Sequence, residues 1–327
     1  MKKGILSVAL LSLVLITTQA MAAGGKTVRL GHGQTAGSAV DNFAQHLAKA
    51  VNERAKGALN VQVFPSSQLG KERDMIESLQ LGAVELNIQG DILMSIVAPE
   101  WGLVLTTPFV IRSKDHFRKV VDGPPAKPIY DAILERKGVR HLGWVNRGPR
   151  YLTSNKMVKE PADVKGMKIR VPDGVEAYMV AWKLLGAAVT PLDISEVFLG
   201  LRQGTVDAQE NPLEIIVNQS FYEVQKYVHE TAHLYTGFEI VASEKWFKTL
   251  SPELQKVVTD AAAEAVAFGN KAQATDEAVL EAKLKQKGMI FNPVDRAKFE
   301  DALKDLPKQP FAAKWKPGFF EAVKAVK

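Results

Sequence analysis

Short runs of alternating apolar and polar positions are separated along this chain by longer segments of helical period. Leu59, Val61 and Val63 alternate with polar residues, which predicts a strand, whereas Phe43, Leu47 and Val51 recur every four residues, which predicts one face of a helix. The first half therefore contains strands separated by helices. We expect strands at residues 28–31, 59–63 and 84–89, and helices at 39–55 and 72–81.

A second unit with the same alternation begins after residues 144–149. Strands are expected at 168–171 and 188–190, and helices at 175–185 and 195–203, the last ending at Gly204. Strands joined by helices of this length form parallel sheets, so the fold class is α/β, with two lobes.

The longest helical pattern covers residues 252–287. At 1.5 Å per residue it would extend for roughly 50 Å, more than one small domain measures. It either crosses between the lobes or packs along one of them, and length alone does not decide.

The first 22 residues have the plan of a signal peptide. Lys2 and Lys3 precede an apolar run at 5–16 and a small-residue cleavage site at 20–22. No later run is long enough to span a bilayer, so we expect an exported periplasmic protein, with a retained membrane anchor as the alternative. There are no cysteines, which excludes disulfides and lipid attachment through cysteine.

The net charge is modest. It is +6 for the whole chain and falls by two, to +4, when Lys2 and Lys3 are removed with the signal peptide. No basic cluster is dense enough for nucleic acid, so no nucleic-acid partner is expected. No cofactor motif is present, and we expect a monomer without a cofactor.

Arg170 is the most informative single residue. Met167, Ile169 and Val171 alternate with Lys168 and Arg170. The arginine side chain therefore points away from the opposite face of a short strand. A guanidinium can bind a carboxylate through two parallel hydrogen bonds, which lysine cannot do. The alternative is a surface arginine on an edge strand.

Three segments around Arg170 carry a family resemblance. With three shorter segments, they resemble the DctP-type solute-binding proteins of TRAP transporters (tripartite ATP-independent periplasmic transporters). The resemblance implies a two-lobed periplasmic binding protein, type II-like, that closes over its ligand, with a long helix spanning both lobes. The main segments are DVKGMKIRVP (163–172), TPLDISEVF (190–198) and GTVDAQENP (204–212); the shorter ones are FPSSQLG (64–70), RYLTSN (150–155) and FYEVQK (221–226).

The resemblance also implies a function. Such a protein is a receptor and not an enzyme, and it delivers a small organic acid to a membrane permease of the TRAP type. We expect residues 23–147 with 237–276 to form lobe I, and residues 148–236 with 277–327 to form lobe II.

The family pattern places three residues at the ligand carboxylate. Arg170 would clamp it, Arg150 would support it, and Asn211 would donate its side-chain amide. The alternative for Arg150 is a charged loop residue exposed to solvent. Asn211, which precedes Pro212, is also an ordinary turn residue.

Four further candidates have open alternatives. Asp173 and Asp193, like Glu176, would accept hydrogen bonds from ligand hydroxyls or cap helices, and capping is favoured. Gln89, with Asp91, would face the far end of the ligand or lie in a loop. His32, within the glycine-rich loop 31–37, would approach the ligand or be a structural histidine.

Other residues are not expected at the site. Arg147 is interpreted as a surface residue, and Trp144 and Trp182 as core. The sequence HETAH (229–233) spells the zinc-protease pattern HExxH and is the basis of the alternative function, a periplasmic zinc hydrolase. That pattern requires a continuous helix and a third ligand, and neither is predicted here.

The identity of the acid stays open at this point. Gly33 and Gly90 stand where sialate-binding relatives carry polar side chains, which disfavours sialate. A C4-dicarboxylate, a sugar acid such as a uronate, or another hydroxy or oxo acid remains. A sensor that signals to a partner protein is an alternative that the chain alone does not separate from a transport receptor.

Overall fold

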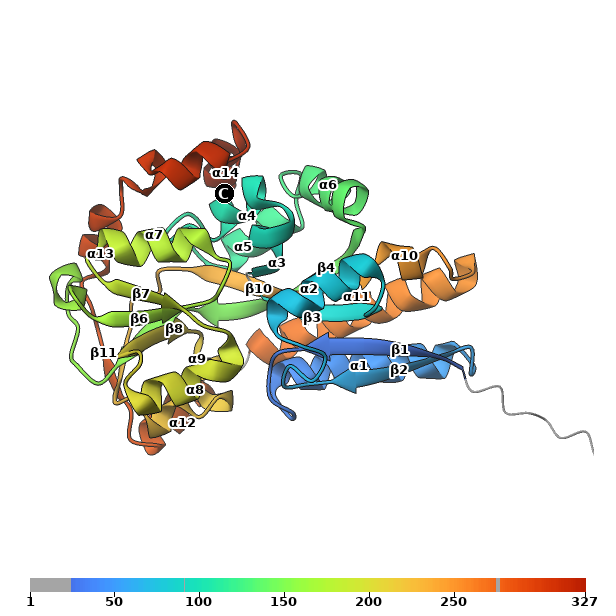
Figure 1. Cartoon of the computed structure of the whole chain (residues 1–327), viewed down its shortest axis with the longest axis horizontal. Helices are drawn as coiled ribbons and strands as arrows, with labels where there is room; N and C mark the ends of the chain where they lie inside the picture. Colours follow the sequence, from blue (N-terminus) through green and yellow to red (C-terminus); the bar gives the residue numbers. More distant parts are fainter. Residues whose placement is uncertain (1–24, 91, 275–276) are drawn as a thin grey trace, which may run out of the picture.

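The chain folds around two β-sheets that lie side by side and organise two lobes (Figure 1). The computed structural model describes residues 25–90, 92–274 and 277–327. The predicted signal peptide, residues 1–22, and Asp91 lie outside the described residues. Within the described part, no helix is both long and apolar enough to cross a membrane.

The first sheet has five strands in the order β2-β1-β3-β10-β4. Strand β1 pairs in parallel with β2 and β3, whereas β10 runs antiparallel to both β3 and β4. The pairing of β10 with β4 has two register irregularities. The strands are β1 (Lys26–His32), β2 (Leu59–Phe64), β3 (Leu86–Gln89), β4 (Val139–Pro149) and β10 (Tyr235–Ser243).

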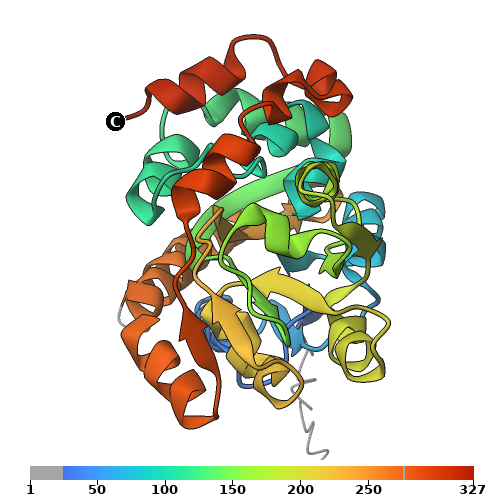
Figure 2. The same cartoon turned by 90° about the vertical axis from the view of Figure 1, so that its left-hand side faces the viewer.

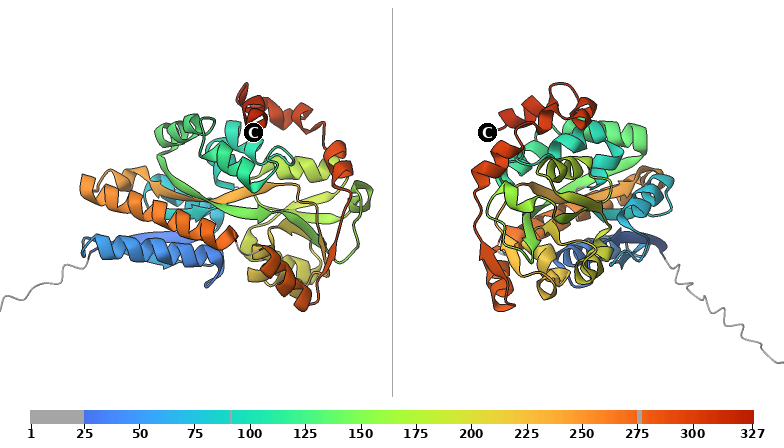
Figure 3. Two further views of the ribbon diagram at one scale, coloured as in Figure 1. Left: turned by 180° about the vertical axis from the view of Figure 1, so that it is seen from behind. Right: turned by 60° about the vertical axis from the view of Figure 1, so that its left-hand side comes forward.

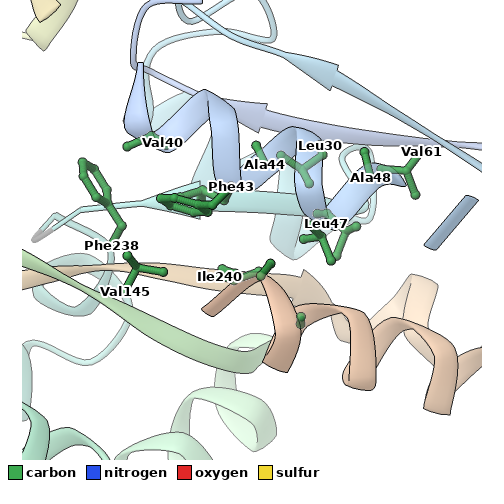
Figure 4. Packing of buried hydrophobic residues seen from close by; sticks show 14 of the residues in the cluster. Leu30, Val40, Phe43, Ala44, Leu47, Ala48, Val61, Val145, Phe238 and Ile240 are labelled. Carbon is green, nitrogen blue, oxygen red and sulfur yellow. The ribbon is translucent and has the colours of Figure 1, made fainter. Parts of the chain in front are cut away.

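The predicted apolar face of the first helix, α1 (Ala39–Arg54), is buried against this sheet. Phe43, Leu47 and Val51 are each at most 1% exposed. Figure 4 shows Phe43 and Leu47 directed toward Ile240 of β10 and Val145 of β4. Burial of several large side chains on one face stabilises the helix far more than its intrinsic propensity does.

The second sheet has six strands in the order β11-β9-β5-β8-β6-β7. Strand β6 pairs in parallel with β7 and β8, and β5 runs antiparallel to β8 and β9. The strands are β5 (Tyr151–Ser154), β6 (Lys168–Val171), β7 (Ala188–Pro191), β8 (Ala208–Asn211), β9 (Tyr227–His229) and β11 (Ile290–Asn292).

The expectation of parallel sheets is correct for the strand-helix-strand units and wrong for the rest. Strands β4, β5 and β10 are not joined to their neighbours by a crossover helix, so nothing forces them to run parallel. Long strands β4 and β10 lie side by side from the first sheet toward the second, which links the lobes (Figure 3). Both sheets are therefore mixed, and the predicted α/β fold with two lobes is confirmed.

Helices cover both faces of the first sheet. Side chains of α1 and α11 (Pro252–Ala274) share a cluster with Ile240, whereas α5 (Lys114–Val121) and α6 (Lys127–Lys137) share the opposite cluster with Val241. The two tryptophans interpreted as core, Trp144 and Trp182, are each 4% exposed. The remaining helices before α11 are α2 (Glu72–Leu81), α3 (Ile92–Val97), α4 (Pro99–Leu105), α7 (Glu176–Leu184), α8 (Ile194–Gln203), α9 (Leu213–Asn218) and α10 (Glu244–Phe247).

The long helical pattern forms two helices. Helix α11 packs on α1 and β4, and α12 (Glu277–Gln286) packs on α9 beside the second sheet, so this segment contacts both lobes. Residues 275–276, between the two helices, lie outside the described residues.

The C-terminal segment returns from the second sheet to the helices of the first, as the red ribbon in Figure 2 shows. After β11 come α13 (Arg296–Ala302) and α14 (Phe319–Ala325), and α14 packs on α4. The Arg112 guanidinium donates to the Lys324 carbonyl at 3.1 Å, which fixes the end of the chain. The predicted lobe boundaries stay predictions.

Candidate functional site

A cavity that is partly open to solvent lies between the two sheets. It is lined from both sides and combines three guanidinium groups with amide, carboxylate and apolar surfaces. The first-sheet side contributes Gln34, Glu72, Gly90, Ile92, Arg147 and Phe238, and the second-sheet side contributes Arg150, Arg170, Pro172, Ile194 and Asn211.

Arg170 reaches this cavity from β6. Its strand neighbours Ile169 and Val171 are fully buried, and Arg170 itself is 1% exposed. Its Nε and Nη2 donate to the Leu192 carbonyl at 2.9 and 2.6 Å, which fixes the guanidinium plane. Among the described residues no acidic side chain forms an ion pair with it.

Burial lowers the pKa of Arg170 to about 10, because a cation in a dry site loses its hydration. The nearby carboxylates of Glu210 and Glu72 act in the opposite direction and limit this lowering of the pKa. The guanidinium therefore stays charged at neutral pH. It is a buried, oriented cation whose binding to an anion would recover part of the lost hydration.

Arg150, between β4 and β5, has a carboxylate of its own. Its Nε lies 2.5 Å from Glu210 Oε2 and its Nη2 lies 2.9 Å from Glu210 Oε1. Glu210 is fully buried on β8, and His233 Nε2 lies 3.1 Å from the same carboxylate. Burial acts to raise the pKa of Glu210, but Arg150 and His233 outweigh it and lower the pKa to about 2.

Asn211 is held at the cavity wall by the same network. Its Oδ1 accepts from Arg150 Nη2 at 3.1 Å, and its Nδ2 donates to Gln209 Oε1 at 2.7 Å. The structure thus brings together Arg170, Arg150 and Asn211, as the sequence predicted. Glu210 was missed, although a carboxylate inside a buried strand signals a charged partner.

Arg147 lines the cavity, so its interpretation as a surface residue is wrong. It is 4% exposed, and its guanidinium lies 4.2 Å from the centroid of the Phe238 ring. The alternation of side chains along β4 could have indicated that Arg147 is buried. Val145 and Arg147 are two residues apart, hence on one face, and Val145 is fully buried.

Gln89 and His32 are not among the residues that line the cavity. His32 is fully buried at the end of β1, with Nε2 3.2 Å from Asp41 Oδ1, and burial lowers its pKa. Gln89, at the end of β3, donates through Nε2 to the Glu72 carbonyl at 3.2 Å. His32 thus connects β1 to α1, and Gln89 connects β3 to α2.

The cavity adjoins a second space, which we call the mouth. It contains Asp173 and Asp193, so the structure brings these two residues together with Glu72 and Ile92, which line both spaces. The full lining of the mouth is Lys71, Glu72, Arg73, Asp74, Ile92, Asp173, Pro191, Leu192, Asp193 and Glu196.

Contacts across the mouth join the start of α2 to α8 and to the loop after β6. The Lys71 amine lies 2.7 Å from the Glu196 carboxylate, and Arg73 Nε lies 3.3 Å from Asp173 Oδ2. The two lobes are therefore in contact beside the cavity.

The two candidate helix caps differ. Asp193 caps α8, accepting from the Ser195 amide at 3.0 Å, and its Oδ2 also accepts from the Glu72 amide at 3.2 Å. Asp173 does not cap α7, whose N-cap is Val175, so capping was the wrong interpretation there. Glu176 forms an ion pair with Lys314.

The HETAH segment does not form the helix that a zinc protease needs. His229 ends β9, and its Nε2 lies 2.8 Å from Ser154 Oγ, whereas His233 binds Glu210. The histidines thus belong to separate networks, and burial lowers the pKa of His229 to about 4. No group of three or more His, Cys, Asp or Glu residues that could hold a metal ion occurs in the described ranges. The geometry gives the alternative zinc hydrolase no support.

Comparison with known proteins identifies the family. Residues 30–314 match the model of the bacterial extracellular solute-binding proteins of family 7, DctP. A solute-binding protein of Roseobacter denitrificans is 37% identical over 279 residues, which cover 85% of each chain.

Solved structures give the same result. A TRAP periplasmic solute-binding protein of Roseobacter denitrificans, with bound L-galactonate, matches with a TM-score of 0.86 and 35% identity over 92% of this chain and 98% of that one. The protein from Sulfurospirillum deleyianum, with bound succinate, matches with a TM-score of 0.87 and 28% identity over 93% and 100%.

These matches cover nearly all of the described chain, and they confirm the predicted periplasmic binding-protein fold and periplasmic location. The family consists of solute-binding proteins that are not catalysts, which confirms that interpretation as well. The protein therefore belongs to the DctP family of TRAP periplasmic solute-binding proteins.

Proposed function

We propose that this protein binds a small organic acid in the cavity between its lobes and delivers it to a TRAP permease, acting as a monomer. The observation that carries the proposal is Arg170, a buried and oriented guanidinium at the wall of the cavity between the lobes. Similar proteins are known to bind carboxylates, L-galactonate in one structure and succinate in another.

Arg170 would bind the ligand carboxylate. Its bonds to the Leu192 carbonyl use Nε and Nη2, which leaves Nη1 and the second hydrogen of Nη2 as donors for a ligand. Asn211 would contribute its amide, and Arg150, already bound to Glu210, would supply additional positive potential. Charge-assisted bonds of this kind are about twice as strong as neutral ones.

Closure of the lobes would make this binding strong. The interaction of two charges grows several-fold when water is removed from between them. A ligand that contacts both walls has more contacts in the closed state than in the open one. Its differential affinity therefore shifts the population toward the closed state.

The proposal is tested first by a thermal-shift screen of the mature protein against carboxylic acids. Sugar acids, hydroxy acids and dicarboxylates form the panel, with the corresponding amides and alcohols as uncharged controls. A ligand present at a hundred times its Kd adds about 2.7 kcal/mol of stability. Stabilisation by an acid but not by its amide supports the proposal, and no response to any acid contradicts it.

Delivery needs a separate test. Uptake of the identified acid is measured in cells that carry a TRAP permease, with and without this receptor. Uptake that depends on the receptor supports the transport role. Binding without receptor-dependent uptake would point to a sensor instead.

A further inference from the structure

The two walls of the cavity carry different chemistry. The second-sheet wall holds Arg150, Arg170 and Asn211, which the proposed function assigns to the ligand carboxylate. The first-sheet wall presents Arg147 and Glu72 to the same space. These two residues therefore face whatever part of the ligand extends away from its carboxylate.

Arg147 is fixed in position by its surroundings. Its guanidinium stacks on Phe238 at 4.2 Å, and its Nη1 lies beside Gly90. A Cβ atom at Gly90 would come within 3.2 Å of Nη1, so the glycine leaves the room that the arginine head occupies. A guanidinium carries only hydrogen-bond donors.

Glu72 supplies the complementary groups. It is the first residue of α2 and lines both the cavity and the mouth. Its carboxylate is close enough to Arg170 to counteract the lowering of that residue's pKa. An ionised carboxylate carries only hydrogen-bond acceptors.

A donor-only group and an acceptor-only group at one wall match a hydroxyl, which both accepts and donates. A second carboxylate would match only the arginine of this pair. That group has no proton to give Glu72 and would place a like charge near it in a partly enclosed site, where repulsion is stronger than in water. An alkyl chain would leave both charged groups without ligand contacts.

We infer that Arg147 and Glu72 are specificity-determining residues that select a hydroxylated monocarboxylate over a dicarboxylate of the same length. The inference rests on the proposed function, since it takes the ligand carboxylate to lie at Arg170. It narrows the ligand to hydroxylated acids of the aldonate or uronate type.

Two matched ligand sets test the selection by titration calorimetry. The four-carbon set is D-erythronate, succinate and butyrate, and the six-carbon set is L-galactonate, adipate and hexanoate. Each set holds chain length constant and changes only hydroxyls and the second acid group. One of the two sets will bind wild type more tightly. Within that set, we expect the hydroxylated acid to bind at least about tenfold more tightly than the dicarboxylate, which is a difference in binding free energy of about 1.4 kcal/mol.

Two variants assign the selection to residues. Glu72→Gln removes the negative charge, so the preference for hydroxy acid over dicarboxylate should fall at least about tenfold. Arg147→Met keeps an unbranched stem on Phe238 and removes the donors. It should weaken hydroxy-acid binding at least about tenfold while the plain alkyl acid stays within about twofold.

Matched controls come from exposed positions away from the cavity. Glu77→Gln, on the same helix as Glu72, and Arg202→Met, on α8, should leave every affinity within about twofold of wild type. Thermal unfolding of each variant shows whether it folds. If Arg147→Met does not fold, Glu72→Gln decides the question alone, because Glu72 is only partly buried.

Some outcomes overturn only this inference. The first is a wild type that prefers the dicarboxylate, and the second is a Glu72→Gln variant with unchanged selectivity. In both cases Arg170→Ala still weakens the binding of all the acids. A different result overturns the proposed function itself. In that case no acid binds wild type, or Arg170→Ala binds every acid as wild type does.

Discussion

The floor of the cavity and its mouth both contain opposite charges in contact, yet the two regions differ in access to water. At the floor, which we define as Arg150, Glu210 and Arg170, the side chains of the Arg150–Glu210 pair are 2% and 0% exposed. At the mouth, those of Lys71 and Glu196 are 53% and 46% exposed. Similar bond lengths thus occur in very different dielectric surroundings.

This difference gives the two regions different tasks. A buried charge without a partner is unfavourable, so the charged side chains of the floor keep their geometry, and binding of an anion there is favourable. Exposed ion pairs contribute little and weaken as salt screens them. The mouth can therefore break its cross-lobe contacts whenever the lobes open, while the floor remains assembled.

The largest effect is expected from Glu210→Ala. It leaves the buried Arg150 cation without its carboxylate and should lower the free energy of unfolding by about 3–5 kcal/mol, as chemical denaturation would measure. Asp260→Ala, which breaks an exposed pair with Lys256 on α11, is the control and should have a much smaller effect. Equal losses in the two variants would contradict the contrast between buried and exposed pairs.

Arg170→Ala should weaken ligand binding by about 2–5 kcal/mol, because one partner of a buried charge pair is removed. Arg170→Lys should also bind poorly, since a point charge cannot form two parallel bonds. Calorimetry with the acid found in the screen measures both, and Arg202→Ala is the exposed control. Wild-type affinity in the lysine variant would show that the carboxylate is not clamped in this way.

The pH dependence of stability should separate Glu210→Gln from wild type. The pKa of Glu210 is about 2 in the folded state and near 4.3 in an unfolded chain. Between these values the unfolded state binds more protons, so this contribution to stability is present above about pH 4.3 and is lost as the pH falls toward 2.

The stability difference between wild type and Glu210→Gln should therefore be largest at neutral pH and narrow on acidification. Chemical denaturation at pH 7, 4 and 3 measures it, with Glu77→Gln as the exposed control. A difference that stays constant over this range would show that the charge of Glu210 is not what stabilises the floor.

The smallest effect is expected at the mouth. Glu196→Gln removes the contact with Lys71 and should change the ligand Kd by less than about threefold at low salt. Any change should disappear at high salt, because screening removes the contribution in wild type as well. Calorimetry at both salt concentrations checks this. A loss as large as that of Arg170→Ala would mean that the mouth, and not the floor, dominates binding.

Local pattern was enough to predict most elements. The alternation at 168–171 predicted β6, and Phe43, Leu47 and Val51 predicted the buried face of α1. These predictions succeed because side-chain period follows directly from backbone geometry. The antiparallel direction of β10 was not predicted by the same reasoning, because partners distant in sequence decide the direction of a strand.

The sequence by itself determined the α/β class and the family, and it predicted that Arg170, Arg150 and Asn211 lie together, because motif and period are local properties. Only the tertiary structure decided that Arg147 and Glu72 face the same cavity, that Glu210 and His233 hold Arg150, and that Asp173 binds Arg73 rather than capping a helix. The physical reason is that burial and pairing depend on which lobe folds over which, and no local pattern encodes that.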